Sequence, residues 1–405
     1  MKSIHVAQRI RQLTPAMIDV IKNYTAELRL TGVHVYNLGQ AIPNFPPVPA
    51  AIEAARQALS EPDTHIYSPD AGLLPLRQAL CTTLARENGI LADPEREVLI
   101  TAGANQAFLM AMLTLLEPGD RVLLPGPYFF NHEMAVRLAG GVPLEVPLSP
   151  ETGFQLRLAD LQPHLEPPPR ALVVCTPNNP TGAVYDPAEL ARIARELSAR
   201  GVALVTDETY QHLIYESARH FSPASLPEAR SQVVTIGSFS KTYSLTGWRV
   251  GFLVAAAPFV EEALKVQDTM VICAAVIAQK AALGALREDA AVVARRREEL
   301  DRRRRLLTER LGEVPALSWR PTAGSFFAFV HVAGCTDSLK LALQVLEQAH
   351  VVTIPGSLFG RCGQGYLRLS YGSVDLEELE EACTRLAGFF GKGASATQLS
   401  HLRSR

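Results

Sequence analysis

Residues 238–251 read SFSKTYSLTGWRVG and follow an apolar run, Val233 to Ile236, that is typical of a buried strand. Lys241 is therefore expected just beyond the end of that strand, where a charged amine is costly unless it is neutralised or used. Burial lowers the pKa of an amine, and a lysine that forms an imine needs such a lowered pKa. The alternative is a solvated surface lysine that follows a strand.

The neighbours of Lys241 favour the chemical interpretation. Arg249 supplies a planar cation eight residues later, between glycines at positions 247 and 251 that let backbone approach closely. Ser238 and Ser240 add two small hydroxyl groups on the other side of the lysine. Together these residues predict a phosphate pocket with a nucleophilic amine beside it.

The composition bounds the class of protein. A chain of 405 residues is long enough for two domains, and 47% hydrophobic with 20% charged residues is ordinary for a soluble globular enzyme. A net charge of -2 gives no reason to expect nucleic acid or an anionic membrane as a partner. The sequence has no apolar run of membrane-spanning length and no signal-peptide pattern, so a cytoplasmic location is expected.

The six cysteines are scattered, with no Cys-x-x-Cys pair and no histidine cluster. This pattern argues against a metal site and for buried thiols in a reducing compartment.

Residues 98–256 alternate short β-rich runs with helical patterns, which is typical of an α/β fold with a mostly parallel sheet covered by helices on both faces. The predicted strands are Val98–Thr101, Arg121–Pro125, Ala171–Thr176, Val202–Asp207, Val233–Ile236 and Val250–Ala255. Ligands bind outside the carboxyl ends of the strands in such sheets. Four of these ends carry polar, glycine-rich or aromatic segments, at residues 101–105, 125–132, 176–182 and 207–210.

The remaining segments predict a smaller α+β unit. Residues 1–30 have apolar positions at helical spacing, and Glu288–Leu311 is a long charged helix whose basic run is expected to be a solvated face. Arg368 lies among apolar residues of a predicted strand without a fixed acidic partner in the sequence. It is interpreted as a carboxylate receptor, with an internal salt bridge as the alternative.

The pattern Ser-x-Ser-Lys, followed by Gly-Trp-Arg-x-Gly, resembles the pyridoxal-phosphate lysine segment of the class I/II aminotransferases, which are fold-type I enzymes related to aspartate aminotransferase. The resemblance extends from about residue 30 to about residue 390. It implies a large cofactor-binding domain over residues 45–287 and a small α+β domain from residues 1–44 and 288–392. Residues 393–405 are expected to be a disordered tail.

The resemblance also implies a role for each matching residue. The implied catalytic residues are Lys241, which holds the cofactor as a Schiff base, Asp207, which pairs with the ring nitrogen, and Tyr210, which donates to the ring hydroxyl. The implied cofactor-binding set is Gly103, Ala104, Asn105, Phe129, Asn179, Asp207, Tyr210, Ser238, Ser240, Lys241, Arg249 and Tyr67. The implied substrate-binding set is Gly39, Ala41, Asn179 and Arg368, and Ala41 stands where the family usually has glycine, so either Gly39 or Ala41 makes the contact.

Tyr67 matches a tyrosine that reaches the cofactor phosphate of a neighbouring subunit, which implies a homodimer with shared active sites. Glu208 is expected to be a surface or domain-interface residue.

The implied function is transfer of the amino group of an L-amino acid to a 2-oxo acid. Asn105 stands where dicarboxylate-specific members can carry a lysine, so a neutral or aromatic substrate is expected. The alternatives are an aspartate-type aminotransferase and an eliminating enzyme, such as a β-lyase or a cyclopropane-carboxylate synthase, on the same site. A regulator with an aminotransferase-like domain would need a DNA-binding module, for which residues 1–30 are too few.

Overall fold

The computed structural model describes residues 4–11, 13 and 17–391. The N-terminal region expected to be helical contains α1 (Gln8–Arg11) and α2 (Met17–Leu30). The predicted tail, residues 393–405, lies outside the described residues. No helix in the described part of the chain is both long and apolar enough to cross a membrane.

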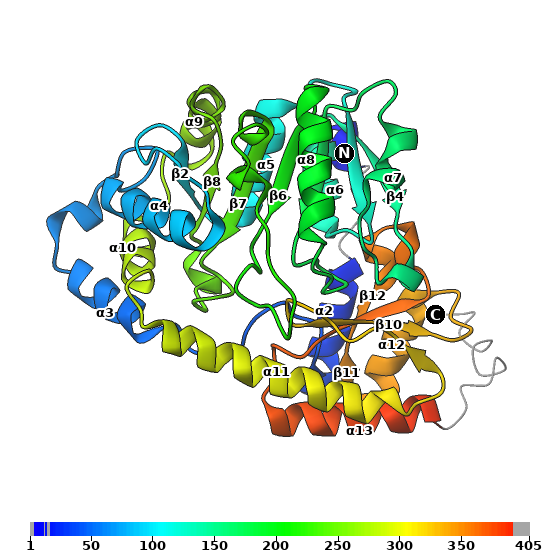
Figure 1. The fold of residues 1–405 in the computed structure, drawn as a ribbon. Coiled ribbons are helices and arrows are strands. Elements are labelled where there is room, and N and C mark those ends of the chain that lie inside the picture. Colours follow the sequence, from blue (N-terminus) through cyan, green and yellow to red (C-terminus); the bar gives the residue numbers. More distant parts are fainter. Residues whose placement is uncertain (1–3, 12, 14–16, 392–405) are drawn as a thin grey trace.

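A seven-stranded sheet forms the centre of the molecule, in the order β2-β8-β7-β6-β5-β3-β4 (Figure 1). Its strands are β2 (Val98–Thr101), β3 (Arg121–Gly126), β4 (Val142–Pro147), β5 (Ala171–Cys175), β6 (Ala203–Asp207), β7 (Val233–Ser238) and β8 (Gly251–Val254). All are parallel except β8, which runs antiparallel to both of its neighbours. The expected α/β class with a mostly parallel sheet is confirmed.

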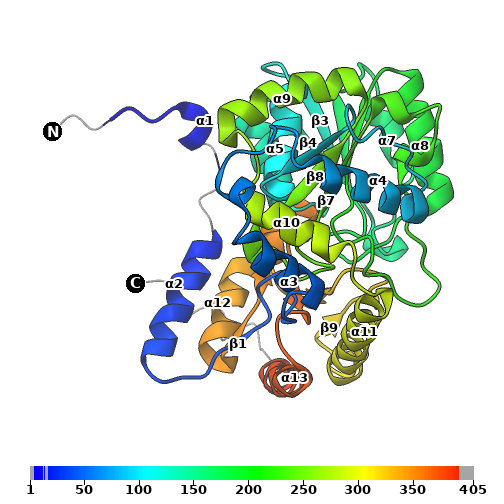
Figure 2. The same cartoon turned by 90° about the vertical axis from the view of Figure 1, so that its left-hand side faces the viewer.

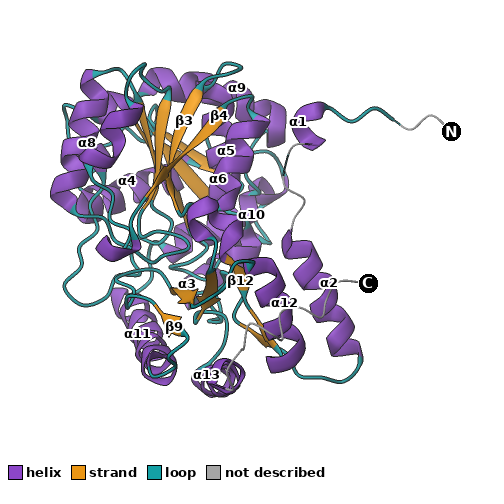
Figure 3. Cartoon of the chain, turned by 90° about the vertical axis from the view of Figure 1, so that its right-hand side faces the viewer, coloured by secondary structure: helices purple, strands orange, loops and turns teal. Residues whose placement is uncertain are grey.

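Helices cover both faces of this sheet, and Figure 3 shows the strands as a twisted layer between them. One face is covered by α3 (Pro49–Ala58), α4 (Leu74–Asn88), α8 (Pro187–Ala199) and α10 (Val276–Ala285), and the other by α5 (Ala104–Leu115), α6 (Phe130–Leu138) and α9 (Ala257–Val271). The neighbours Val173 and Val174 in β5 belong to different apolar clusters, one on each face. This alternation follows from the two-residue period of a strand and explains why the strand sequences are apolar throughout.

A second, four-stranded sheet has the order β12-β13-β10-β9. It comprises β9 (Leu317–Ser318), β10 (Phe327–Val332), β12 (Ile354–Pro355) and β13 (Tyr366–Ser370), beside α11 (Ala290–Gly312), α12 (Ser338–Ala349) and α13 (Leu376–Gly391). Near it, β1 (Tyr36–Asn37) pairs in parallel with β11 (Val351–Val352). A separate apolar cluster, which includes Leu300, Val330 and Leu379, fills this unit. These observations support the proposal of a small domain built from both ends of the chain.

The long charged helix α11 packs beside α13, as Figures 1 and 2 show. The expectation that its basic run is a solvated face is wrong for Arg303 and Arg304, which are only 3% and 5% exposed. Nη1 of Arg303 donates to Oδ1 of Asn44 at 2.7 Å, and its guanidinium group lies 5.0 Å from the centre of the Phe45 ring. These arginines therefore contact neighbouring loops rather than solvent. A basic helix face is solvated only where no other segment packs against it.

Candidate active site

The polar residues predicted at the strand ends meet in one cavity of about 150 Å³. Its walls are formed by Ala41, Ala104, Asn105, Phe129, Cys175, Asn179, Asp207, Thr209, Tyr210, Ser238, Ser240, Lys241 and Arg249. The strands bring them together because β5, β6 and β7 are in register, with Cys175 opposite Asp207 and Asp207 opposite Ile236. The cavity thus lies at the carboxyl edge of the central sheet, where ligands of open α/β sheets bind.

Lys241 lines this cavity, and its Nζ donates to the backbone oxygen of Ala41, another lining residue, at 2.6 Å. Burial lowers the pKa of Lys241 to about 8, and the positive charges of Arg249 and Arg368 add to that effect against the opposing charge of Asp207. A large fraction of the amine is therefore neutral in mildly alkaline solution, as a nucleophilic amine requires.

Asp207 ends β6 as a buried carboxylate with two partners. Its Oδ2 accepts a hydrogen bond from Nε2 of His132 at 3.1 Å, and its Oδ1 accepts one from the backbone amide of Thr209 at 3.1 Å. Burial acts to raise the pKa of Asp207, but the hydrogen bonds and the charge of His132 outweigh it, so the net shift is downward. The site therefore keeps a negative charge inside the protein at neutral pH.

His132 is a residue that the sequence interpretation missed. It is 3% exposed, and its ring stacks on Phe108 with the ring centres 4.2 Å apart. It lies three residues after Phe129, and the two rings meet edge to face at 5.3 Å. The sequence could have indicated this contact, because residues three apart at the start of a helix share one face.

The start of α5 and Arg249 together form a candidate anion-binding site. Gly103 precedes the helix with a φ of 89°, and a side chain at this position would overlap the guanidinium group of Arg249. Nη1 of Arg249 donates to the backbone oxygen of Thr246 at 2.9 Å, which fixes the group beside the helix start. Free amides at a helix N-terminus and a guanidinium group both bind phosphate, so the residues present fit a phosphorylated ligand.

Arg368 lies in β13 at the edge of this site and is 3% exposed. Its Nη1 donates to Oδ1 of Asn179 at 2.9 Å and its Nη2 to the backbone oxygen of Gly39 at 2.6 Å, while its buried Nε has no partner. Burial lowers the pKa of Arg368 to about 10. No ion pair with a carboxylate is found for Arg368 among the described residues, which supports the carboxylate-receptor prediction over an internal salt bridge.

The loop before Phe45 contributes two carbonyl groups rather than one. The backbone oxygen of Gly39 accepts from Arg368, whereas the backbone oxygen of Ala41 accepts from Lys241. Which of Gly39 and Ala41 contacts the substrate carboxylate stays a prediction.

Tyr210 and Tyr67 occupy opposite environments. Tyr210 is 4% exposed, its ring meets Phe326 and Phe327 edge to face, and burial raises its pKa. Tyr67 is 74% exposed and does not line the cavity of its own chain. A role for Tyr67 within a partner's site stays a prediction.

The expectation that Glu208 is a surface or domain-interface residue is wrong, because it is buried and its hydrogen-bond partners all lie within residues 45–287. It is 2% exposed and accepts hydrogen bonds from Thr206 Oγ1 at 2.9 Å, Ser222 Oγ at 2.8 Å and His220 Nε2 at 2.8 Å. This hydrogen-bond network could not be predicted from the sequence, because its members come from separate segments that only folding brings together.

Comparison with known proteins agrees with the geometry. Residues 33–386 match the model of the family "Aminotransferase class I and II". The chain is 38% identical to aromatic-amino-acid aminotransferase 2 of Thermococcus litoralis, over 94% of this chain and 97% of the relative. It is 36% identical to an aspartate aminotransferase of Pyrococcus abyssi, with the same coverage of both chains.

Solved structures lead to the same conclusion. An aromatic aminotransferase from Pyrococcus horikoshii superposes with a TM-score of 0.85 at 37% identity, over 93% of this chain and 100% of that one. The aspartate aminotransferase of Thermus thermophilus with maleate gives a TM-score of 0.89 at 34% identity, over 95% and 100% of the two chains. The chain belongs to the class I and II aminotransferases, a family of fold-type I, pyridoxal-phosphate-dependent enzymes.

Proposed function

We propose that the protein transfers the amino group of an L-amino acid to a 2-oxo acid, with pyridoxal phosphate held through Nζ of Lys241. The observation that carries this proposal is a partly buried amine of lowered pKa in the same cavity as the buried carboxylate of Asp207. A lysine in solvent would be protonated, and a buried carboxylate on a cavity wall is suited to pair with a cationic ligand.

The cofactor, when bound, supplies an electron sink at its protonated ring. Asp207 would hold the proton on the ring nitrogen, and its hydrogen bond from His132 orients this carboxylate. Tyr210 and Asn179 would hydrogen-bond the ring oxygen, and Phe129 would stack on the ring.

The start of α5 (Gly103, Ala104 and Asn105), Arg249, and the hydroxyl groups of Ser238 and Ser240 would hold the phosphate. Nζ of Lys241 would move the substrate's α-proton as a general acid and base. Its lowered pKa suits both directions of that transfer, since the amine can accept and return a proton near neutral pH.

Arg368 would receive the substrate's α-carboxylate, because its buried guanidinium group has only neutral partners in Asn179 and Gly39 and its Nε has no partner. Asn105 and Phe129 line the cavity, and its two cations, Lys241 and Arg249, are assigned to the imine and the phosphate. This supports a neutral or aromatic amino acid as the preferred substrate. The relatives named above include both aromatic and aspartate aminotransferases, so an aspartate-type activity is the second candidate.

We also propose a homodimer in which Tyr67 of the partner subunit completes the phosphate site. The supporting observation is that Tyr67 is a 74% exposed aromatic residue on an ordered loop, held where Ser68 Oγ accepts a hydrogen bond from Gln279 Nε2 at 3.0 Å.

Absorbance spectroscopy of the purified protein with pyridoxal phosphate tests the proposed reaction. Adding phenylalanine, other neutral amino acids or aspartate is expected to convert the cofactor to its aminated form, and a 2-oxo acid is expected to restore the aldehyde form. Recovery of the aldehyde form with release of ammonia and without a 2-oxo acid would favour an eliminating enzyme. Absence of any spectral change with the whole panel would contradict the proposal.

A further inference from the structure

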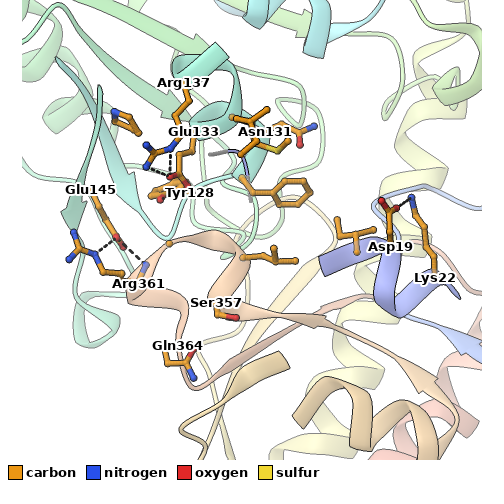
Figure 4. A pocket seen from close by; sticks show the side chains of 17 residues that line it. Asp19, Lys22, Tyr128, Asn131, Glu133, Arg137, Glu145, Ser357, Arg361 and Gln364 are labelled. Carbon is orange, nitrogen blue, oxygen red and sulfur yellow. Dashed lines mark hydrogen bonds and ion pairs between the residues drawn. The ribbon is translucent and has the colours of Figure 1, made fainter. Parts of the chain in front are cut away.

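A second cavity of about 890 Å³ lies between α2, α6, β4 and the loop of residues 356–364 (Figure 4). Charged side chains on its walls lie in pairs, with Glu133 beside Arg137 and Glu145 beside Arg361. Glu145 differs from the others because its side chain is only 9% exposed and comes from the edge strand of the central sheet. None of the site residues predicted from the sequence lines this cavity.

The carboxylate of Glu145 accepts two backbone hydrogen bonds from the loop. Its Oε2 accepts from the amide of Arg361 at 3.0 Å, and its Oε1 accepts from the amide of Cys362 at 2.9 Å. The ion pair with Nε of Arg361 is longer, at 3.5 Å, and the Arg361 side chain is 95% exposed. An exposed pair of this kind contributes little, whereas charge-assisted bonds from backbone amides are strong, so the carboxylate acts on the loop backbone.

The loop lies directly against this carboxylate. Gly360 has a φ of 98°, and a Cβ at that position would lie 2.7 Å from Oε1 of Glu145 and 2.9 Å from the ring of Tyr128. The preceding carbonyl group, of Phe359, accepts a hydrogen bond from the amide of Tyr128 at 3.0 Å. Hydrogen bonds with Tyr128 and Glu145 therefore hold three consecutive peptide groups of the loop, between residues 359 and 362.

The same loop carries the Phe359 ring, which is fully buried against Arg368. The guanidinium carbon of Arg368 lies 5.2 Å from the centre of the Phe359 ring and 4.6 Å from that of Phe327. Phe327 belongs to β10, in register with β13, so its position is fixed by the sheet. Phe359 lies in the loop and also packs against Phe130 and Phe329, so its position depends both on these rings and on what holds the loop backbone.

We propose that Glu145 is a positioning residue for substrate recognition: by fixing the backbone of residues 360–362, it holds Phe359 against Arg368 and orients that guanidinium group for the substrate's α-carboxylate. The inference rests on the proposed function through the role given to Arg368. A guanidinium group that packs against two rings has less rotational freedom before the ligand binds, and this favours binding of a carboxylate in one geometry.

Three variants separate the contributions of this residue. Glu145→Ala removes both acceptors, and Glu145→Gln keeps the shape of the side chain with one acceptor oxygen. Arg361→Ala is the matched control, because it removes the exposed ion pair and leaves both backbone hydrogen bonds in place. Circular dichroism and melting temperature show whether each variant folds. If Glu145→Ala does not fold, Glu145→Gln is compared with the wild-type protein instead.

The first measurement compares two substrates of the holoenzyme, phenylalanine and 2-phenylethylamine, which differ only in the α-carboxylate. Single-turnover spectra are expected to show apparent binding of phenylalanine weakened about tenfold in Glu145→Ala and roughly threefold in Glu145→Gln. The amine is expected to change less than about twofold, as is either substrate with Arg361→Ala. Equal losses for phenylalanine and the amine would mean a general structural role and would overturn the inference.

The second measurement does not depend on turnover. Calorimetric binding of 3-phenylpropionate to the cofactor-free protein is expected to weaken about tenfold in Glu145→Ala, because the ligand retains only the carboxylate that Arg368 receives. No binding to the wild-type protein, or equal binding to both, overturns the inference. If amino acids leave the cofactor spectrum unchanged while carboxylate binding still depends on Glu145, the proposed reaction fails and the inference stands.

Discussion

Nη1 of Arg368 and Oδ1 of Asn179 are 2.9 Å apart, and the two side chains are only 3% and 2% exposed. Asn179 follows β5 of the central sheet, whereas Arg368 belongs to β13 of the smaller sheet, so this bond links the two units at the site. An amide oxygen is a neutral partner, and it leaves the positive charge of Arg368 uncompensated. A ligand with a carboxylate can supply the compensating negative charge, and in the proposed reaction Asn179 would contact both cofactor and substrate.

Arg368→Lys is expected to lower kcat/KM for amino acids about a hundredfold, because a lysine cannot donate to Asn179, Gly39 and a carboxylate in one plane. Steady-state kinetics with phenylalanine measures the loss. Arg192→Lys is a suitable control, since the Arg192 side chain is 61% exposed at the surface. A loss of less than threefold would mean that Arg368 does not bind the substrate.

Lys241 should destabilise the cofactor-free protein in a pH-dependent way. Its pKa is lowered from 10.5 to about 8, so below pH 8 both folded and unfolded states are protonated and the full cost of burying the charge is present. Between pH 8 and 10.5 the unfolded state binds more protons, so the stability contributed by this group rises with pH. The stabilisation gained by Lys241→Met is therefore expected to fall from about 3 kcal/mol at pH 7 to about 1.5 kcal/mol at pH 9.5.

Urea unfolding of the cofactor-free protein at the two pH values measures this difference. Lys265→Met is the control, because the Lys265 side chain is 71% exposed and should give no comparable trend. A stabilisation by Lys241→Met that is the same at both pH values would show that the Lys241 amine is not desolvated.

The central sheet was predictable because fully buried strands leave unbroken apolar runs. Val98–Thr101 is a strand with the predicted bounds, and the run at Val233 extends to Ser238 in β7. Strand β4, Val142–Pro147, was missed because it carries Pro143 and Pro147, which a strand tolerates at the edge of a sheet. Whether a strand lies at the edge of a sheet depends on the whole topology, so it cannot be predicted from the local sequence.

The candidate site was predictable where its residues lie in local motifs, such as Lys241 and Arg249. Partners of other residues come from distant segments: His132 is 75 residues from Asp207, and Arg361 is 216 residues from Glu145. Hydrogen bonds across such separations depend on how helices and loops pack. Arg303 shows the same limit, since a basic helix face becomes buried only because the Asn44 loop lies on it.

Glu208→Ala is expected to destabilise the protein by about 3–5 kcal/mol, because it leaves the hydroxyl groups of Thr206 and Ser222 and the ring of His220 without their buried acceptor. Glu208→Gln keeps one acceptor oxygen and is expected to cost less than half as much. Chemical denaturation of the two variants gives both values. A change below 1 kcal/mol for Glu208→Ala would mean that this network does not stabilise the fold.

Mixing two inactive or weakened variants tests the shared site. Lys241→Ala is expected to abolish turnover, and Tyr67→Phe is expected to weaken cofactor binding by removing a phosphate hydrogen bond. A mixed dimer of the two has one site with both native residues, so activity above the sum of the separate variants is expected after subunit exchange. A fully active monomer, established by light scattering at assay concentration, would contradict the homodimer proposal.

The last prediction concerns the choice of substrate at Asn105, which lines the cavity at the start of α5. An amide cannot form an ion pair, so the distal carboxylate of aspartate gains no charge partner there, whereas an apolar side chain loses nothing. In competition for one 2-oxo acid, the wild-type protein is expected to use phenylalanine with a higher kcat/KM than aspartate. Asn105→Lys is expected to raise kcat/KM for aspartate relative to phenylalanine by about tenfold or more, because it adds a cation that can pair with the distal carboxylate. Asn105→Gln, which alters size without charge, should leave that ratio near its wild-type value, and a wild-type preference for aspartate would show that a cation outside the described cavity wall sets the specificity.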